Sequence, residues 1–145
     1  MIYLGIDPGK NGALAIIYED DTHREFVFDE DTFLYELMAL SGKKVKCVLE
    51  SVHSMPGDSK RGAFSFGENF GYIKGLLKAF RISYELVPPQ KWKKEFSVTA
   101  DKNTSIEVAQ RLFPGSDFRA TERCKKQHDG KCEALLMAEY ARRNL

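Results

Sequence analysis

The first eighteen residues consist of two apolar runs separated by a turn. The opening run is apolar over residues 1–6 and ends in a single charge, at Asp7. It is too short to cross a membrane and predicts a central strand instead. A proline and two glycines follow, which favours a sharp turn because proline cannot donate to a sheet ladder and glycine tolerates positive φ. We therefore expect a hairpin whose second strand covers residues 13–18.

Later segments switch between the two-residue period of strands and the longer period of helices. Apolar residues alternate over 45–50, which predicts a strand that ends at Glu50. Short strands are also expected over 25–28 and 82–87. Apolar positions three and four apart predict helices over residues 31–40, 66–80, 104–113 and 129–143. Three leading strands followed by alternation indicate an α/β protein with a mixed sheet and helices on both faces.

Turn-forming and acidic residues mark the connections between these elements. Residues 51–62 contain a proline and two glycines, so we expect a mobile loop after the strand that precedes them. The acidic strings at 19–21 and 29–31 are interpreted as a hairpin tip and a helix start rather than as metal sites, with Asp31 or Thr32 as the helix cap.

Three glycines recur every fourth residue in the helix expected over 66–80, at Gly67, Gly71 and Gly75. Positions four apart share one face of a helix, and each glycine costs about 1 kcal/mol relative to alanine. Such a ridge permits close backbone approach, either to the domain's own sheet or to a second copy of the chain. The sequence leaves both alternatives open.

The composition is typical of one globular domain. The chain has 145 residues, a common domain size, and contains no internal repeat, linker or low-complexity segment, so we expect a single domain over residues 1–145. Because the sequence opens directly into a strand, we expect no basic and apolar signal segment. Three cysteines without a disulfide-framework spacing favour reduced thiols, so we expect a cytoplasmic protein.

The net charge of +1 conceals a strong difference between the two halves of the chain. Residues 1–58 hold five Lys and Arg against eleven Asp and Glu, whereas residues 59–145 hold seventeen against ten. Basic residues cluster at 60–61, 91–94 and 119–131. Each cluster could follow a phosphate backbone, although a solvated surface is an equally good reading of any one of them.

Four carboxylates stand out because two end apolar strands and two lie four residues apart on a helix: Asp7, Glu50, Asp129 and Glu133. Like charges at that helical spacing repel by a few tenths of a kcal/mol, so a bound cation is an economical explanation. Hard divalent ions prefer oxygen ligands, and two of them about 4 Å apart can drive phosphodiester hydrolysis. Any one of these acids alone is more often a solvated charge, but strand-end acids would otherwise need buried partners.

The order and spacing of several short motifs resemble those of the RuvC-type Holliday junction resolvases, within the RNase H-like (retroviral integrase) superfamily. The phage-encoded branch is the most similar. The segments that carry the resemblance span the whole chain and lie at residues 5–9, 12–15, 48–50, 66–75, 87–94, 128–130 and 133–135. The chain departs from the family at Glu133, where an aspartate is common, and the preceding acid usually lies three or four residues earlier.

The resemblance implies an RNase H-like fold with a mixed five-stranded sheet. It implies a metal-dependent, structure-selective DNA endonuclease, a crossover junction endodeoxyribonuclease that cuts four-way junctions in a bacterial or phage-infected cell. The four carboxylates would be catalytic and would hold two Mg²⁺ or Mn²⁺ ions, with His128 joining or replacing Asp129 as a ligand or assisting proton transfer. The glycine-ridge helix would form a homodimer, which suits a symmetric substrate.

Residues outside the acidic site are candidates for DNA contacts. The family carries an aromatic residue on the loop after the second acid, so His53 or Phe64 is expected to stack on a base, although an exposed loop histidine needs no such role. Trp92 could stack in the same way, although a tryptophan is more often a packing anchor. The remaining candidates are cationic, and the family keeps a needed lysine at one of these positions, Lys102. They are Lys60, Arg61, Lys91, Lys93, Lys94, Lys102, Lys125 and Lys126.

Three other functions compete with this interpretation. A ribonuclease H uses the same fold and acids on RNA:DNA hybrids. A non-catalytic branched-DNA-binding module would not need all four acids. A sugar-kinase-like or actin-like ATPase also begins with a strand, an aspartate and glycines, but it needs two such domains.

A zinc site is a weaker alternative at Cys124, His128 and Cys132, which recur every fourth residue. Structural zinc usually has four ligands, and the other histidines lie far away in sequence. We therefore expect free thiols there.

Overall fold

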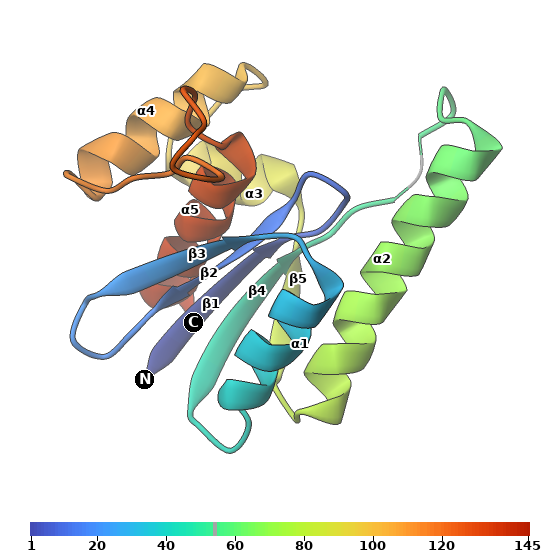
Figure 1. Ribbon diagram of the computed structural model, residues 1–145, viewed down its shortest axis with the longest axis horizontal. Coiled ribbons are helices and arrows are strands. Elements are labelled where there is room, and N and C mark those ends of the chain that lie inside the picture. The colour runs from blue at the N-terminus through green and yellow to red at the C-terminus, as the bar shows by residue number, and fades with distance from the viewer. Residues whose placement is uncertain (54) are drawn as a thin grey trace.

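Helices and strands follow one another in the order that the apolar pattern predicts, with one additional short helix. The computed structural model describes residues 1–53 and 55–145 (Figure 1). Its elements are β1 (Ile2–Asp7), β2 (Ala13–Ile17), β3 (His23–Val27), α1 (Glu30–Ala39), β4 (Val45–Glu50), α2 (Lys60–Ala79), β5 (Tyr84–Val87), α3 (Pro89–Glu95), α4 (Lys102–Leu112) and α5 (Asp129–Asn144).

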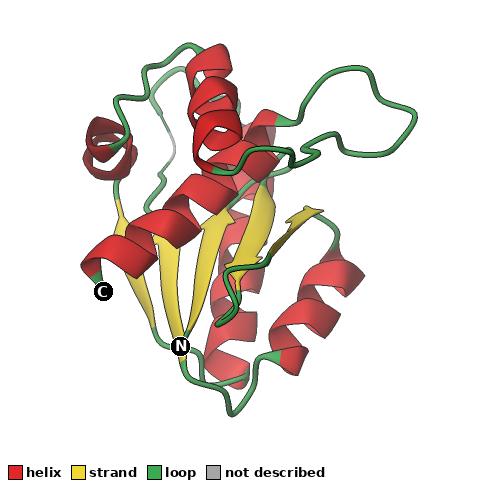
Figure 2. Cartoon of the chain, turned by 90° about the vertical axis from the view of Figure 1, so that its left-hand side faces the viewer, coloured by secondary structure: helices red, strands yellow, loops and turns green. Residues whose placement is uncertain are grey.

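The strands form a five-stranded mixed sheet in the order β3-β2-β1-β4-β5. The first three strands pair antiparallel, whereas β1 with β4 and β4 with β5 pair parallel. Helices α1 and α2 cover one face of this sheet, and α5 covers the other, with α3 and α4 packed against α5 on that side (Figures 1 and 2). The expected fold class, a mixed sheet with helices on both faces, is confirmed.

Strand β1 shows how the two-residue period sorts side chains between the two cores. Ile2, Leu4 and Ile6 are buried on the side of α1 and α2. The alternate position Gly5 faces α5, and an added Cβ there would lie 2.1 Å from the Ala134 oxygen. The glycine therefore permits the close crossing of α5 over β1. Asp7, two residues further along the strand, leaves β1 on the same side as α5.

The turn after β1 depends on glycine for two different reasons. Gly9 has a φ of 126°, which favours glycine as expected. Gly12 does not have a positive φ. A Cβ added at this position would lie 1.9 Å from the Asp7 backbone oxygen, so no larger residue fits. The tight return of the chain, rather than a left-handed conformation, explains the second glycine.

Helix α2 begins earlier than the sequence suggested. The Ser59 side chain caps it by accepting a hydrogen bond from the Gly62 amide, so the end of the expected 51–62 loop is helical. A glycine in a capped first turn does not stop a helix. Helix α1 is capped by Asp29 rather than by Asp31 or Thr32.

Helix α3 was not expected, because consecutive prolines after β5 were interpreted only as the end of a strand. Pro89 occupies the first helical position, where its fixed φ suits a helix and its missing N–H costs nothing. Elsewhere, β3 begins at His23, two residues before its expected start.

Across the described part of the chain, no helix has the length and apolar character needed to cross a membrane. The three cysteines are free thiols, with Cys47 and Cys132 buried and Cys124 partly exposed.

Candidate active site

Asp7 and Glu50 lie side by side because they end neighbouring parallel strands. Ile6 of β1 is in register with Leu49 of β4, so the two residues that follow leave the sheet at the same edge. Glu133 joins them from α5, one turn after the start of that helix and directly before the Ala134 contact with β1. Three of the four predicted carboxylates therefore come together from separate elements.

Proximity and burial disfavour the charged forms of these carboxylates. Desolvation, followed by the charges of Glu50 and Glu133, raises the pKa of Asp7 well above its ordinary value. Burial also raises the pKa of Glu50, which is 7% exposed, against the opposing effect of a hydrogen bond from Trp92. The cluster is thus an electronegative site that a cation would stabilise.

A lysine from α4 partly supplies that cation. Nζ of Lys102 lies 3.2 Å from Oε1 of Glu133 and 3.5 Å from Oδ2 of Asp129. Partial burial disfavours the ammonium, but Glu133 and then Asp129 and Asp7 outweigh this effect and raise the pKa of Lys102. This lysine, predicted as a DNA contact, is paired with the acids of the site.

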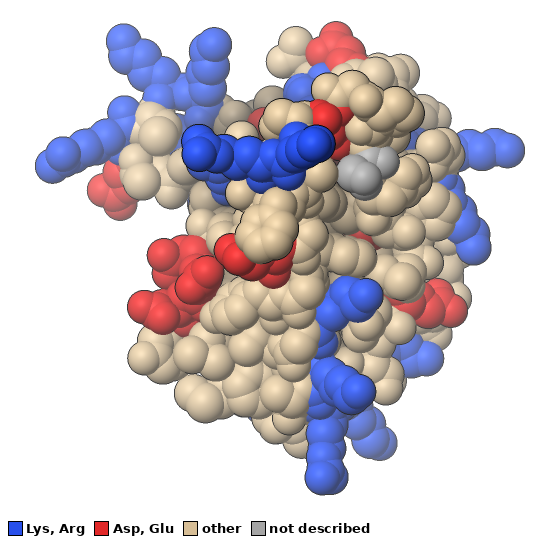
Figure 3. Space-filling view, turned by 90° about the vertical axis from the view of Figure 1, so that its right-hand side faces the viewer, with Lys and Arg blue, Asp and Glu red and all other residues tan. Residues whose placement is uncertain are grey.

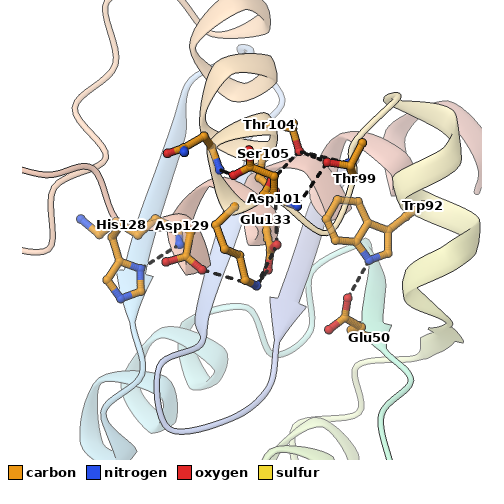
Figure 4. Close-up of polar contacts among 12 residues, drawn as sticks. Glu50, Trp92, Thr99, Asp101, Thr104, Ser105, His128, Asp129 and Glu133 are labelled. Carbon is orange, nitrogen blue, oxygen red and sulfur yellow. Dashed lines mark hydrogen bonds and ion pairs between the residues drawn. The ribbon is translucent and has the colours of Figure 1, made fainter.

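Hydrogen bonds at the start of α4 fix the place from which Lys102 projects (Figure 4). The Asp101 side chain accepts from the Asn103 amide at 3.0 Å, and the Thr104 hydroxyl donates to the Asp101 carbonyl at 2.6 Å. The Thr99 amide donates in turn to the Thr104 hydroxyl at 3.0 Å. Because Lys102 is the first helical residue, this capping network fixes the backbone from which its side chain reaches Glu133 and Asp129.

Two buried donors hold the two buried glutamates (Figure 4). The indole Nε1 of Trp92 donates to Oε2 of Glu50 at 2.7 Å, and Oγ of Ser105 donates to Oε1 of Glu133 at 3.2 Å. Both donors are 0% exposed. Ser105 was not predicted as a site residue. A serine among the inward positions of an amphipathic helix could have indicated a buried hydrogen bond.

Asp129 and His128 stand at the beginning of α5, and Asp129 is the more exposed acid of the site, with 43% of its side chain accessible. His128 is the N-cap residue, and its Nδ1 accepts a hydrogen bond from the Lys131 amide at 3.2 Å. Gly130 allows the helix start to approach the β1–β2 turn, since a Cβ there would lie 2.6 Å from the Asn11 oxygen. The ring of His128 lies beyond Asp129 as seen from Glu133 (Figure 4).

The donor set fits a hard divalent cation. Among residues 1–53 and 55–145, no three His, Cys, Asp or Glu side chains lie close enough together to hold one ion in common. Magnesium needs fewer protein ligands, because it binds through one or two carboxylates and retains water. The ammonium of Lys102 occupies a position between Glu133 and Asp129 that a metal ion could take. Burial first, and then the charges of Glu50 and Glu133, raise the pKa of Asp7, so a cation beside it would favour its charged form.

Most predicted DNA-contact residues are accessible, with one exception. Trp92 is fully buried, so the prediction that it stacks on DNA is wrong; its hydrogen bond to Glu50 and the surrounding apolar core hold it inside. Phe64 is 73% exposed, His53 is exposed, and Lys93 is half-buried beside the Trp92 ring. The other cationic candidates are exposed and are Lys60, Arg61, Lys91, Lys94, Lys102, Lys125 and Lys126.

Basic side chains do not form one continuous patch on the face that carries α2. Figure 3 shows them at the upper and lower parts of this face, with acidic side chains between.

The glycine ridge of α2 does not pack against the sheet. A Cβ added at Gly67, Gly71 or Gly75 would meet nothing within 4 Å. The buried residues Ile73 and Leu77 occupy the opposite side of the helix. The alternative in which the ridge contacts the domain's own sheet is therefore wrong.

Comparison with solved structures gives the same architecture. No family profile matches the chain. The structure of Thermus thermophilus RuvC superposes with a TM-score of 0.59 at 14% identity, covering 99% of this chain and 96% of that one. The chain has the RuvC fold. T. thermophilus RuvC in complex with a Holliday junction substrate superposes with a TM-score of 0.62 at 11% identity, over 99% and 97% of the two chains.

One curated relative is similar in sequence. It is the chloroplastic Holliday junction resolvase MOC1 of Chlamydomonas reinhardtii, 32% identical over 89 residues. The match covers 60% of this chain but only 10% of the length of that protein. The resemblance to RuvC-type resolvases is confirmed, and the phage-encoded branch stays a prediction.

Proposed function

We propose that this chain is a metal-dependent endonuclease that cuts branched DNA, with four-way junctions as its preferred substrate. The observation that carries the proposal is the convergence of Asp7, Glu50 and Glu133 at one edge of the sheet, beside a lysine that neutralises part of their charge. The RuvC fold and the similarity to a junction resolvase support the substrate class.

The carboxylates would serve as oxygen ligands for Mg²⁺ or Mn²⁺. When bound, such ions activate water for attack on a phosphodiester and stabilise the leaving oxygen. Glu50 and Glu133 are the more rigid donors, because each is nearly buried and held by a buried hydrogen-bond donor. Asp129, more exposed, is free to adjust as substrate enters.

Lys102 would stabilise the carboxylate cluster when no metal is bound. Its side chain is 59% exposed, so it can turn from the carboxylates toward a substrate phosphate when a metal ion takes over their neutralisation. No covalent nucleophile is required. His128 would assist proton transfer as a polar group at the edge of the site.

DNA would be held by exposed cationic and aromatic side chains around this edge. Lys60 and Arg61 begin α2, and Phe64 projects from its first turns into solvent. The first turns of α2 extend beyond the sheet at the edge where β1 and β4 end with Asp7 and Glu50 (Figure 1). Phe64 and His53 would stack on unpaired bases, and the cations would contact phosphates.

The proposed homodimer would form through α2. The glycines at 67, 71 and 75 share a face that is turned away from the core. The missing side chains would allow the backbones of two such helices to approach closely. A two-fold dimer presents two equal sites to a symmetric junction.

A substrate competition tests the proposed function. A labelled four-way DNA junction and a labelled RNA:DNA hybrid are incubated together with the protein and Mg²⁺, with EDTA as the control. We expect metal-dependent cleavage of the junction. Cleavage of the hybrid alone would favour a ribonuclease H, and tight junction binding without cleavage in any divalent metal would indicate a non-catalytic module.

A further inference from the structure

Trp92 is the only tryptophan in the chain, and it is bonded to a carboxylate of the candidate site. Its ring is 0% exposed, and the indole Nε1 lies 2.7 Å from Oε2 of Glu50. A buried tryptophan often packs without a specific role, but its N–H normally finds an acceptor. Here that acceptor is a strand-end carboxylate that is itself only 7% exposed.

The local sequence brings the ring to this place. Val87 of β5 is in register with Glu50 of β4, and the Ser51 amide donates to the Val87 oxygen at 2.8 Å. Helix α3 begins two residues after Val87, at Pro89, so its first turn returns across the strand ends. Trp92 lies one turn into this helix and packs within the core formed with α5.

We propose that Trp92 is the positioning residue for Glu50. By occupying Oε2, the indole fixes the rotation of the carboxylate and leaves Oε1 as the oxygen that is available to a metal ion. This inference rests on the proposed metal-dependent function of the site and adds to it a residue that contacts neither metal nor DNA.

The physical basis is the cost of a buried carboxylate. A nearly buried Glu50 loses its solvation, and this loss is costly unless a hydrogen-bond donor replaces the water. The indole of Trp92 supplies such a donor, and its N–H can only donate. A group that hydrogen-bonds a metal-ligating side chain sets the orientation of that side chain. The loss of such a group typically weakens metal affinity or activity by about 10- to 100-fold. Ser105 orients Glu133 in the same way, through the hydrogen bond from its Oγ to Oε1.

The arrangement also makes Trp92 a reporter of the site. Its emission depends on the charge of the carboxylate that it contacts, and a cation on Oε1 changes that charge. We expect Mn²⁺ or Mg²⁺ to change the fluorescence of the wild-type protein in a saturable way. The Glu50→Gln variant should show no such change, because its amide does not hold the ion.

Two variants test the positioning role directly. Trp92→Phe removes the N–H and part of the ring, and replacement of Trp92 by benzothienylalanine removes the N–H while keeping the ring shape. We expect both to bind Mn²⁺ about 10-fold or more weakly, as counted by electron paramagnetic resonance of the free ion. The control is Phe96→Leu, at the end of α3. It should lower the melting temperature, since Phe96 is buried in the same core. It should leave the Mn²⁺ affinity unchanged, because the Trp92–Glu50 hydrogen bond remains.

The outcomes separate this inference from the proposed function. Wild-type affinity for Mn²⁺ in both folded Trp92 variants would overturn the positioning role, while junction cleavage by the wild-type protein would leave the nuclease proposal standing. A wild-type protein that neither binds Mn²⁺ nor cleaves any branched DNA would overturn both.

Discussion

Nζ of Lys102 lies 3.2 Å from Oε1 of Glu133, a carboxylate that is only 3% exposed. The pair joins the start of α4 to the second turn of α5, 31 residues apart in sequence. It places a positive charge where a metal ion would otherwise neutralise the acids. The relationship between this lysine and the metal is therefore one of electrostatic competition.

Lys102→Met tests that competition. In EDTA we expect the free energy of unfolding to fall by about 1 kcal/mol, a modest value because the lysine is largely exposed. We expect Mg²⁺ affinity to rise, since a competing cation has been removed. Thermal melts across an Mg²⁺ titration measure both effects, and Lys94→Met, at an exposed position on α3, is the control. Weaker Mg²⁺ binding in the Lys102 variant would contradict the interpretation.

Asp7→Asn should stabilise the metal-free protein and inactivate it. The pKa of Asp7 is raised in the folded state by burial and by Glu50 and Glu133, with Lys102 opposing. This carboxyl therefore favours folding below its ordinary pKa of about 4 and disfavours it as the pH rises through the raised value. We expect the gain in melting temperature in EDTA to be larger at pH 8 than at pH 4.

The same variant should lose that advantage when metal is present. Saturating Mg²⁺ should raise the melting temperature of the wild-type protein more than that of Asp7→Asn, because the ion stabilises the charged carboxylates. Junction cleavage should fall by at least about 100-fold. An equal gain at both pH values would show that Asp7 is not held at a raised pKa.

Gly5→Ala should disrupt the approach of α5 to β1. The new Cβ would lie 2.1 Å from the Ala134 oxygen and 2.3 Å from the Ala138 nitrogen, both backbone atoms that cannot move alone. We expect a loss of stability of about 3 kcal/mol and weaker metal binding, because Glu133 moves with the helix. Denaturant unfolding and Mn²⁺ titration measure these effects. Gly57→Ala, where a Cβ meets nothing within 4 Å, should change stability by less than about 0.5 kcal/mol.

Gly71→Arg tests the proposed dimer. The substitution places a long cation in the middle of the exposed ridge, where the backbones of two copies would have to meet. Light scattering should give twice the chain mass of 16.5 kDa for the wild-type protein and the chain mass for the variant. Ser65→Arg, an exposed position of α2 away from the ridge, should remain dimeric. A monomeric wild-type protein at micromolar concentration would contradict the proposal.

The strand-end acids were predictable because their signal is local. Asp7 and Glu50 each end an apolar strand, and the period of two fixes the face from which they leave the sheet. The start of α5 also carries a local signal, because Asp129 and Glu133 lie four residues apart on one helix. The parallel pairing of β1 with β4, which brings the two carboxylates together, was not predicted and is known from the structure.

The supporting residues were not predictable in the same way, because their partners are distant in sequence. Trp92 bonds a carboxylate 42 residues away, and Ser105 bonds one 28 residues away. Lysines on both sides of Trp92 suggested an exposed, nucleic-acid-binding tryptophan, yet the short helix turns the ring inward. The glycine ridge shows the converse case, since its spacing was evident but its exposure depends on which face of α2 meets the sheet.

In the proposed function, the carboxylates at the sheet edge perform metal-dependent cleavage of branched DNA. The most direct test compares the wild-type protein with Glu50→Gln on a labelled four-way junction in Mg²⁺, with binding measured on the same samples by gel shift. We predict that the wild-type protein cuts the junction and that the variant binds it equally well without cutting. Undiminished Mg²⁺-dependent cleavage by Glu50→Gln would contradict the claim.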